Sequence, residues 1–149
     1  SIFESSEGIL YCEIAALAND GTARQISLSD GSSSTNKVSI LYTSTTNQIK
    51  AFVRGGGSIA LNTTHTLSNA LQFNKIALKY KVNDFSLYVN GTEVLSDTSG
   101  AIPTALSDLS LDDADGTQDF YGKIRDIRVY NTKEMTDSEV DILLTKITS

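Results

Sequence analysis

The sequence predicts an all-β fold, an antiparallel sandwich of two sheets with one short α-helix at its C-terminal end. Three observations predict this fold. Short apolar stretches alternate with turn residues through almost the whole chain. Several of these stretches alternate apolar and polar side chains with a period of two, the pattern of a strand buried on one face. Helical periodicity appears only in the last segment.

About ten strands are expected, over residues 8–17, 23–29, 37–43, 48–55, 58–64, 74–82, 85–90, 92–95, 108–112 and 121–130. The segments between them are rich in glycine, asparagine and aspartate, which accept the backbone geometry of tight turns. Asn90-Gly91 is the strongest hairpin signal in the chain. In QIKAFVRG (48–55), we expect the apolar side chains on a buried face and Lys50, Phe52 and Arg54 on the opposite face.

The segment MTDSEVDILLTKI predicts the helix, because its apolar residues repeat at helical spacing: Val140, Leu143, Leu144 and Ile147. Thr136 and Glu139 form a capping-box pattern, so the helix is expected to begin near Asp137. Met135 and Val140 have the spacing of a hydrophobic staple. We expect the helix to dock over an edge of the sandwich.

Composition narrows the range of functions. A chain of 149 residues suits one domain, here 1–149, and its start close to the first strand suggests a domain taken from a longer protein. A net charge of −6 argues against binding to nucleic acid or to anionic lipid. No apolar run is long enough to cross a membrane. The single cysteine, Cys12, excludes an internal disulfide and is expected to be a buried core residue.

The second half of the chain resembles a known family. NKIALKYKVNDFSLYVNGTEV (74–94), DFYGKIRDIRVYN (119–131) and EMTDSEVDILL (134–144) are similar to the corresponding parts of laminin G-like, concanavalin A-like jelly-roll domains. The resemblance implies an antiparallel two-sheet jelly-roll sandwich with one short C-terminal helix. Such sandwiches serve as enzymes, lectins and spacers, so the fold alone does not fix the function.

Within that family, DGTARQISLSDG (20–31), NDFSLYVNG (83–91) and the closing LLTKITS (143–149) resemble jelly-roll domains of tailed-phage structural proteins. This resemblance implies a non-catalytic recognition module on a virion surface, outside the host cell, that binds host-surface polysaccharide. Two alternatives stay open. One is a structural or decorating domain that contacts other virion proteins or copies of itself, and the other is a carbohydrate-binding module of a secreted bacterial enzyme.

Two sets of residues are candidates for binding glycan. Phe52 shares its strand face with Lys50 and Arg54, so an aromatic ring for a sugar's C–H face would lie beside polar groups for its hydroxyls. Tyr88 lies opposite the apolar Leu87 and Val89 and is a second candidate ring. The absence of tryptophan weakens this interpretation, and Phe52 is equally compatible with the rim of the core.

The segment LSLDDADGTQDF (109–120) concentrates acids around one glycine. It does not have the spacing of a helix-loop-helix calcium site, but hard cations accept any converging oxygens, so a looser calcium site is possible. Its candidate ligands are Asp112, Asp113, Asp115 and Asp119. The other interpretation is a solvated hairpin turn at Asp115-Gly116, between the strands 108–112 and 121–130. Asp126 is expected to form a structural ion pair, for which Arg128 is the candidate partner, or a backbone hydrogen bond, and a structural calcium is the alternative.

Evidence for catalysis is weak. Glycosidases of this fold use paired carboxylates on one strand, and the nearest string, Glu139-Val140-Asp141, lies on the predicted helix. His65 is the only histidine and is interpreted as a solvated polar residue. The stripe Lys75, Lys79 and Lys81 can meet an acidic polysaccharide, but solvated lysines that discourage edge pairing are the simpler interpretation. The sequence therefore predicts a protein that is not an enzyme.

Overall fold

The computed structural model describes residues 3–149, which form ten strands and one helix. The elements are β1 (Glu7–Ala16), β2 (Arg24–Ser29), β3 (Lys37–Tyr42), β4 (Gln48–Gly55), β5 (Ser58–Thr66), β6 (Asn74–Lys81), β7 (Phe85–Val89), β8 (Thr92–Asp97), β9 (Asp108–Ser110), β10 (Gly122–Asn131) and α1 (Asp137–Thr148). Each predicted strand is confirmed, with its ends within two residues of the expected ones. The β7–β8 turn has positive φ at Asn90 and Gly91, as its sequence predicts.

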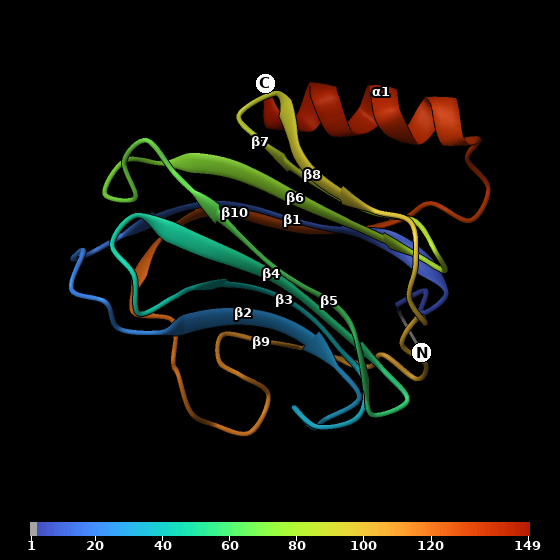
Figure 1. Cartoon of the computed structure of the whole chain (residues 1–149), viewed down its shortest axis with the longest axis horizontal. Helices are drawn as coiled ribbons and strands as arrows, with labels where there is room; N and C mark the ends of the chain where they lie inside the picture. Colours follow the sequence, from blue (N-terminus) through green and yellow to red (C-terminus); the bar gives the residue numbers. More distant parts are fainter. Residues whose placement is uncertain (1–2) are drawn as a thin grey trace.

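The strands form two antiparallel five-stranded sheets in the orders β10-β1-β6-β7-β8 and β5-β4-β3-β2-β9. Figure 1 shows the sheets as two stacked layers, with α1 lying on the outer side of the first sheet. The predicted sandwich of jelly-roll type with a C-terminal helix is therefore confirmed.

The core lies between the two sheets and is built by the period-two pattern. In β4, Ile49, Ala51 and Val53 are fully buried, whereas the residues between them are partly exposed. Cys12 on β1 is also fully buried and belongs to this core, as predicted. The burial of these apolar faces supplies the main driving force for the sandwich.

The helix covers the outer face of the first sheet rather than an edge of the sandwich, so that prediction was wrong. Its buried Val140 and Leu144 pack with residues of β1, β6 and β7: Ile9, Tyr11, Ala77 and Tyr88. The predicted capping box is present, since the Thr136 hydroxyl accepts from Glu139 N and the Glu139 carboxylate accepts from Thr136 N. Within residues 3–149, no helix is long and apolar enough to cross a bilayer.

The acidic segment does not form the predicted hairpin. β9 pairs with β2 in one sheet, and β10 pairs with β1 in the other, so residues 111–121 cross between the sheets. A tight turn is still present, with Gly116 at a φ of 85° and Asp113 N donating to Thr117 O at 3.0 Å. The segment lies along β2, where Gln25 N donates to Gln118 O at 3.0 Å and Ser27 Oγ donates to Asp112 O at 2.7 Å.

Candidate functional site

Among residues 3–149, no helix covers the outer face of the sheet β5-β4-β3-β2-β9. β2 and β3 bow toward the other sheet, so the surface that they turn to solvent is concave (Figure 1). Lys50, Phe52 and Arg54 of β4 point to this side and are partly exposed, as the alternation predicts. The structure therefore brings these predicted residues together on one concave face.

A hollow of about 210 Å³ lies on this face. It is lined by residues of three neighbouring strands and of the crossing segment: Gln25, Lys37, Leu41, Lys50, Phe52 and Gln118. Register explains most of this grouping. Leu41 lies between Gln25 and Lys50, and Lys37 is two residues from Ser39, which lies opposite Phe52. The volume is smaller than that of pockets for drug-sized ligands, about 300–1,000 Å³, and suits a small part of a ligand such as one sugar ring.

Two cations lie close to the Phe52 ring. The Lys37 Nζ is 5.1 Å from the centre of the Phe52 ring, and the Arg54 guanidinium carbon is 5.3 Å from it. Both distances are within the range of a cation–π interaction. Arg54 also donates to the carbonyl oxygens of Ser33 and Ser34, each at 3.4 Å, which orients the guanidinium at the rim.

The side-chain amide of Gln25 forms hydrogen bonds with three side chains at the hollow. Its Oε1 accepts from Lys37 Nζ at 3.2 Å and from Ser39 Oγ at 2.7 Å, and its Nε2 donates to Gln118 Oε1. Desolvation lowers the pKa of the Lys37 ammonium, and the nearby Arg54 lowers it further, while Asp113 and Asp115 act in the opposite direction. The hollow thus combines an aromatic ring, amides and cations, the groups that can contact a sugar's C–H face and its polar substituents.

Sequence reasoning missed four residues of this hollow. Lys37 and Leu41 alternate with Val38 and Ile40, which are buried in the core. The period of two in KVSILY therefore indicated that Lys37 and Leu41 lie on the outward face of the strand. Gln25 lies on β2, every residue of which is buried, so no alternation marked it. Gln118 lies in the crossing segment, where no periodicity applies.

Tyr88 does not belong to the hollow. It is 7% exposed and packs under α1 on the outer face of the other sheet, because it points away from the core toward the apolar face of the helix. The ring is therefore covered by protein and is not available to a sugar.

The acids of the crossing segment do not converge on a common point. Asp112 accepts from Ala114 N at 2.7 Å, and Asp113 accepts from Asp115 N at 2.9 Å and from Thr117 N at 3.0 Å. Asp115 accepts from Ser33 N at 3.2 Å and from the Ser33 hydroxyl. Among residues 3–149 no group of three or more acidic, histidine or cysteine side chains is placed to hold a metal ion, and this includes Asp119. These carboxylates close turns and tie the crossing segment to the 30–36 loop.

Asp126 forms the ion pair that the sequence predicts, with its Oδ2 2.9 Å from Arg128 Nε. It lies on the outer face of β10, opposite Glu13 of β1. Ile124, which the strand pattern placed in a packed position beside it, is 39% exposed instead. The inward side chains of β10 are Ile127 and Val129, which pack against the core.

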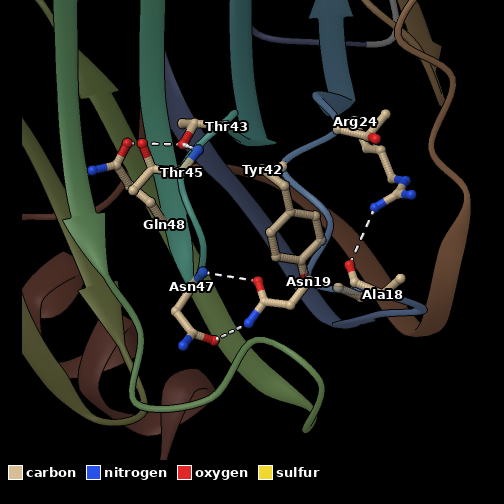
Figure 2. Close-up of a pocket in the computed structure, with 11 residues that line it drawn as sticks. Ala18, Asn19, Arg24, Tyr42, Thr43, Thr45, Asn47 and Gln48 are labelled. Atoms are coloured by element: carbon tan, nitrogen blue, oxygen red, sulfur yellow. Dashed lines mark hydrogen bonds between the residues drawn. The ribbon is translucent and has the colours of Figure 1, made fainter.

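A second pocket lies between the sheets at the end of the sandwich (Figure 2), but it is too small for a sugar. Asn19 and Asn47 face each other there, with Asn19 Nδ2 donating to Asn47 Oδ1 at 2.7 Å and Asn47 N donating to Asn19 Oδ1 at 2.9 Å (Figure 2). Arg24 donates to Ala18 O at 3.4 Å. The space left is about 10 Å³, roughly that of one water molecule. The pocket is a structural feature of the sandwich end.

Comparison with protein families matches residues 14–141 to the Laminin_G_3 family, described as the concanavalin A-like lectin/glucanases superfamily. The match covers most of the chain and confirms the family that residues 74–144 indicated. A search of curated proteins found no match.

Several solved structures share the fold. The carbohydrate-binding module CBM40 of the Ruminococcus gnavus IT-sialidase has a TM-score of 0.68 and 15% identity, over 97% of this chain and 84% of that one. A leech intramolecular trans-sialidase has a TM-score of 0.68 and 18% identity, and the chain spans 23% of it. Sheep galectin-11, in complex with glycerol, has a TM-score of 0.57 and 10% identity, over 87% of this chain and 93% of that one. At these identities the likeness establishes the fold.

Proposed function

Because the chain belongs to the concanavalin A-like lectin/glucanases superfamily, we propose that it is a non-catalytic glycan-binding module with its site in the hollow of the β5-β4-β3-β2-β9 face. The observation that carries the proposal is the position of Phe52. An aromatic ring lies partly exposed on a concave face, surrounded by cations and amides rather than by core residues. A purely structural domain has no need of this arrangement.

The lining of the hollow supports a binding role rather than glycoside hydrolysis. Its lining contains no carboxylate, whereas glycoside hydrolysis needs two across the scissile bond. The candidate string with Glu139 and Asp141 lies on α1, which packs on the outer face of the other sheet. His65 lies on β5 and is not part of the lining.

The structural neighbours favour one biological setting over the other. A binding module of a sialidase, also solved with α2,3 sialyllactose, aligns with 97% of this chain at a TM-score of 0.66. This supports a module that works beside a carbohydrate-active enzyme, the alternative that the sequence left open. The resemblance of residues 20–31 and 143–149 to phage proteins keeps a virion-surface setting as a second hypothesis. Both settings place the domain outside the cell.

A glycan array with the purified domain tests the proposal, run once with calcium and once with a chelator. We expect binding to a class of saccharides that Phe52→Ala abolishes and Tyr121→Ala leaves intact. Tyr121 is a matched control because it is 64% exposed and does not line the hollow. Equal loss in both variants, or no binding to any saccharide, would refute the assignment of this face.

A further inference from the structure

Within residues 3–149, the basic side chains around Phe52 form no ion pair with a carboxylate, whereas most of the other basic residues do. The chain has twelve Lys and Arg residues. In the part of the chain that the structure describes, six of them lie within 4.0 Å of an Asp or Glu carboxylate: Arg24, Lys79, Lys81, Arg125, Arg128 and Lys133. Lys37, Lys50 and Arg54 have no such partner among residues 3–149, although the protein carries a net charge of −6. Three of the six basic side chains without an Asp or Glu carboxylate within 4.0 Å among residues 3–149 therefore lie at or beside the hollow, and the other three are Lys75, Lys123 and Lys146.

Lys37 is unusual in its burial. It is 6% exposed, and its ammonium contacts the Gln25 amide oxygen and the Phe52 ring. A buried charge is normally paired, because desolvation without a counter-charge is costly. Asp113 and Asp115 act on Lys37 only from a distance: neither carboxylate lies within 4.0 Å of its ammonium, and they accept hydrogen bonds from their own turn and from Ser33.

Arg54 has unused donor capacity at the rim. Its Nη1 donates to two carbonyl oxygens at 3.4 Å, and its Nε is buried with no hydrogen-bond partner within residues 3–149. A guanidinium binds carboxylate and sulfate groups well because its donors form a planar fork. Lys37 lies opposite Arg54 across the β3–β4 pair, so both cations point to the same side of the sheet.

We infer that the hollow binds an anionic saccharide, and that Lys37 and Arg54 bind its acid group, a carboxylate or a sulfate, beside the Phe52 ring. This inference rests on the proposed function and names the ligand class of the same site. The bound acid supplies a counter-charge in direct contact with the two cations, which no carboxylate of residues 3–149 does. Lys50, the next outward residue along β4, also lines the hollow and adds positive charge there. The ring packs against the C–H face of the sugar and fixes its position relative to the cations.

The test measures binding of matched acidic and neutral saccharides to the full chain by titration calorimetry. The probes are sialyllactose against lactose, oligogalacturonate against its methyl ester, and heparin oligosaccharide against its desulfated form. We expect at least one acidic member to bind about tenfold or more tightly than its neutral partner, as the loss of a charged hydrogen bond implies. The carboxylate and sulfate arms identify which acid group is used.

Two variants make the result specific. Lys37→Met and Arg54→Gln are each expected to reduce or remove the preference for the acidic member over its neutral partner, measured as the ratio of the two dissociation constants. Lys123→Met removes an exposed lysine of β10, on the other sheet, and is expected to change nothing. A melting curve of each variant shows that it is folded, and Arg54→Gln keeps the test decisive if Lys37→Met is unstable.

The outcomes separate the inference from the proposed function. If neutral and acidic members bind equally and Phe52→Ala still abolishes binding, the glycan site stands and the inference fails. The inference also fails if both charge variants keep the preference for the acidic member. If no saccharide of either kind binds, both the proposed function and the inference fail.

Discussion

Truncation of Leu144 to alanine should loosen the helix from the sheet without touching the hollow. Leu144 is fully buried between α1 and the sheet, in contact with the cluster that contains Tyr88. The loss of three carbon atoms removes about 2.4 kcal/mol of transfer free energy, at about 0.8 kcal/mol for each. The cavity left behind raises the cost to about 3–4 kcal/mol, and the better helix propensity of alanine offsets only a few tenths.

Ile142 provides the matched control on the same helix. It is 67% exposed, so Ile142→Ala removes a similar volume without opening a cavity and should change the free energy of unfolding by less than about 0.5 kcal/mol. Urea denaturation followed by far-ultraviolet circular dichroism measures both variants. Glycan binding of folded Leu144→Ala should equal that of the unmodified protein, because α1 lies on the face opposite the hollow.

A cost below about 1 kcal/mol for Leu144→Ala, or equal costs for the two variants, would refute this reasoning. It would mean that α1 does not cover the outer face of the first sheet, and Tyr88 would again be a candidate ring for binding. Loss of glycan binding in a fully folded Leu144→Ala variant would refute the separation of the helix from the site.

Four further outcomes follow from the structure. Thr136→Ala removes the capping box of α1 and should lower stability by about 1 kcal/mol in the same urea assay. Burial raises the pKa of the Cys12 thiol, so a thiol reagent should react with it only after unfolding in urea, and rapid reaction of the native protein would contradict its place in the core. Burial acts to raise the pKa of Asp113, but hydrogen bonds from Thr117 and from backbone amides lower it below its usual value. A group with a lowered folded pKa stabilises the fold above its unfolded pKa of about 3.9, and this stability is lost as the pH falls through the folded pKa, so Asp113→Ala should reduce the loss of stability on acidification below about pH 4. Calcium and EDTA should give the same melting temperature, since the carboxylates of residues 112–119 do not converge, and a rise with calcium would restore the metal site.

The strands were predictable because each is a local pattern. In β4 the alternation of Ile49, Ala51 and Val53 with Lys50, Phe52 and Arg54 assigns both faces without knowledge of the partners. The helix was equally local, since its capping box and its apolar spacing lie within residues 135–147. For this reason the predicted cationic and aromatic residues of β4 proved to share one concave face.

The wrong predictions are those that depend on which secondary-structure elements pack against each other. Tyr88 alternates with Leu87 and Val89 in the way that an exposed residue would, but a helix that begins about 50 residues later covers it. An outward side chain and a side chain buried by a second layer give the same period of two. Only the packing of α1 on the sheet separates them, and the apolar face of a helix does not specify its partner.

The acidic segment shows why the rest of the site could not be predicted from the sequence. Residues 108–130 look like a hairpin, since two strand patterns flank an Asp-Gly turn, yet β9 and β10 join different sheets. Because the chain crosses between the sheets there, Gln118 reaches Gln25, 93 residues away in the sequence. Gln25 in turn holds Lys37 and Ser39. The acids of this segment therefore hold the crossing segment in place. Their hydrogen bonds close its turns and attach it to Ser33. The Ser33 carbonyl oxygen in turn accepts a hydrogen bond from Arg54 at the rim. The topology of the crossing, and not the spacing of its acids, forms the wall of the hollow.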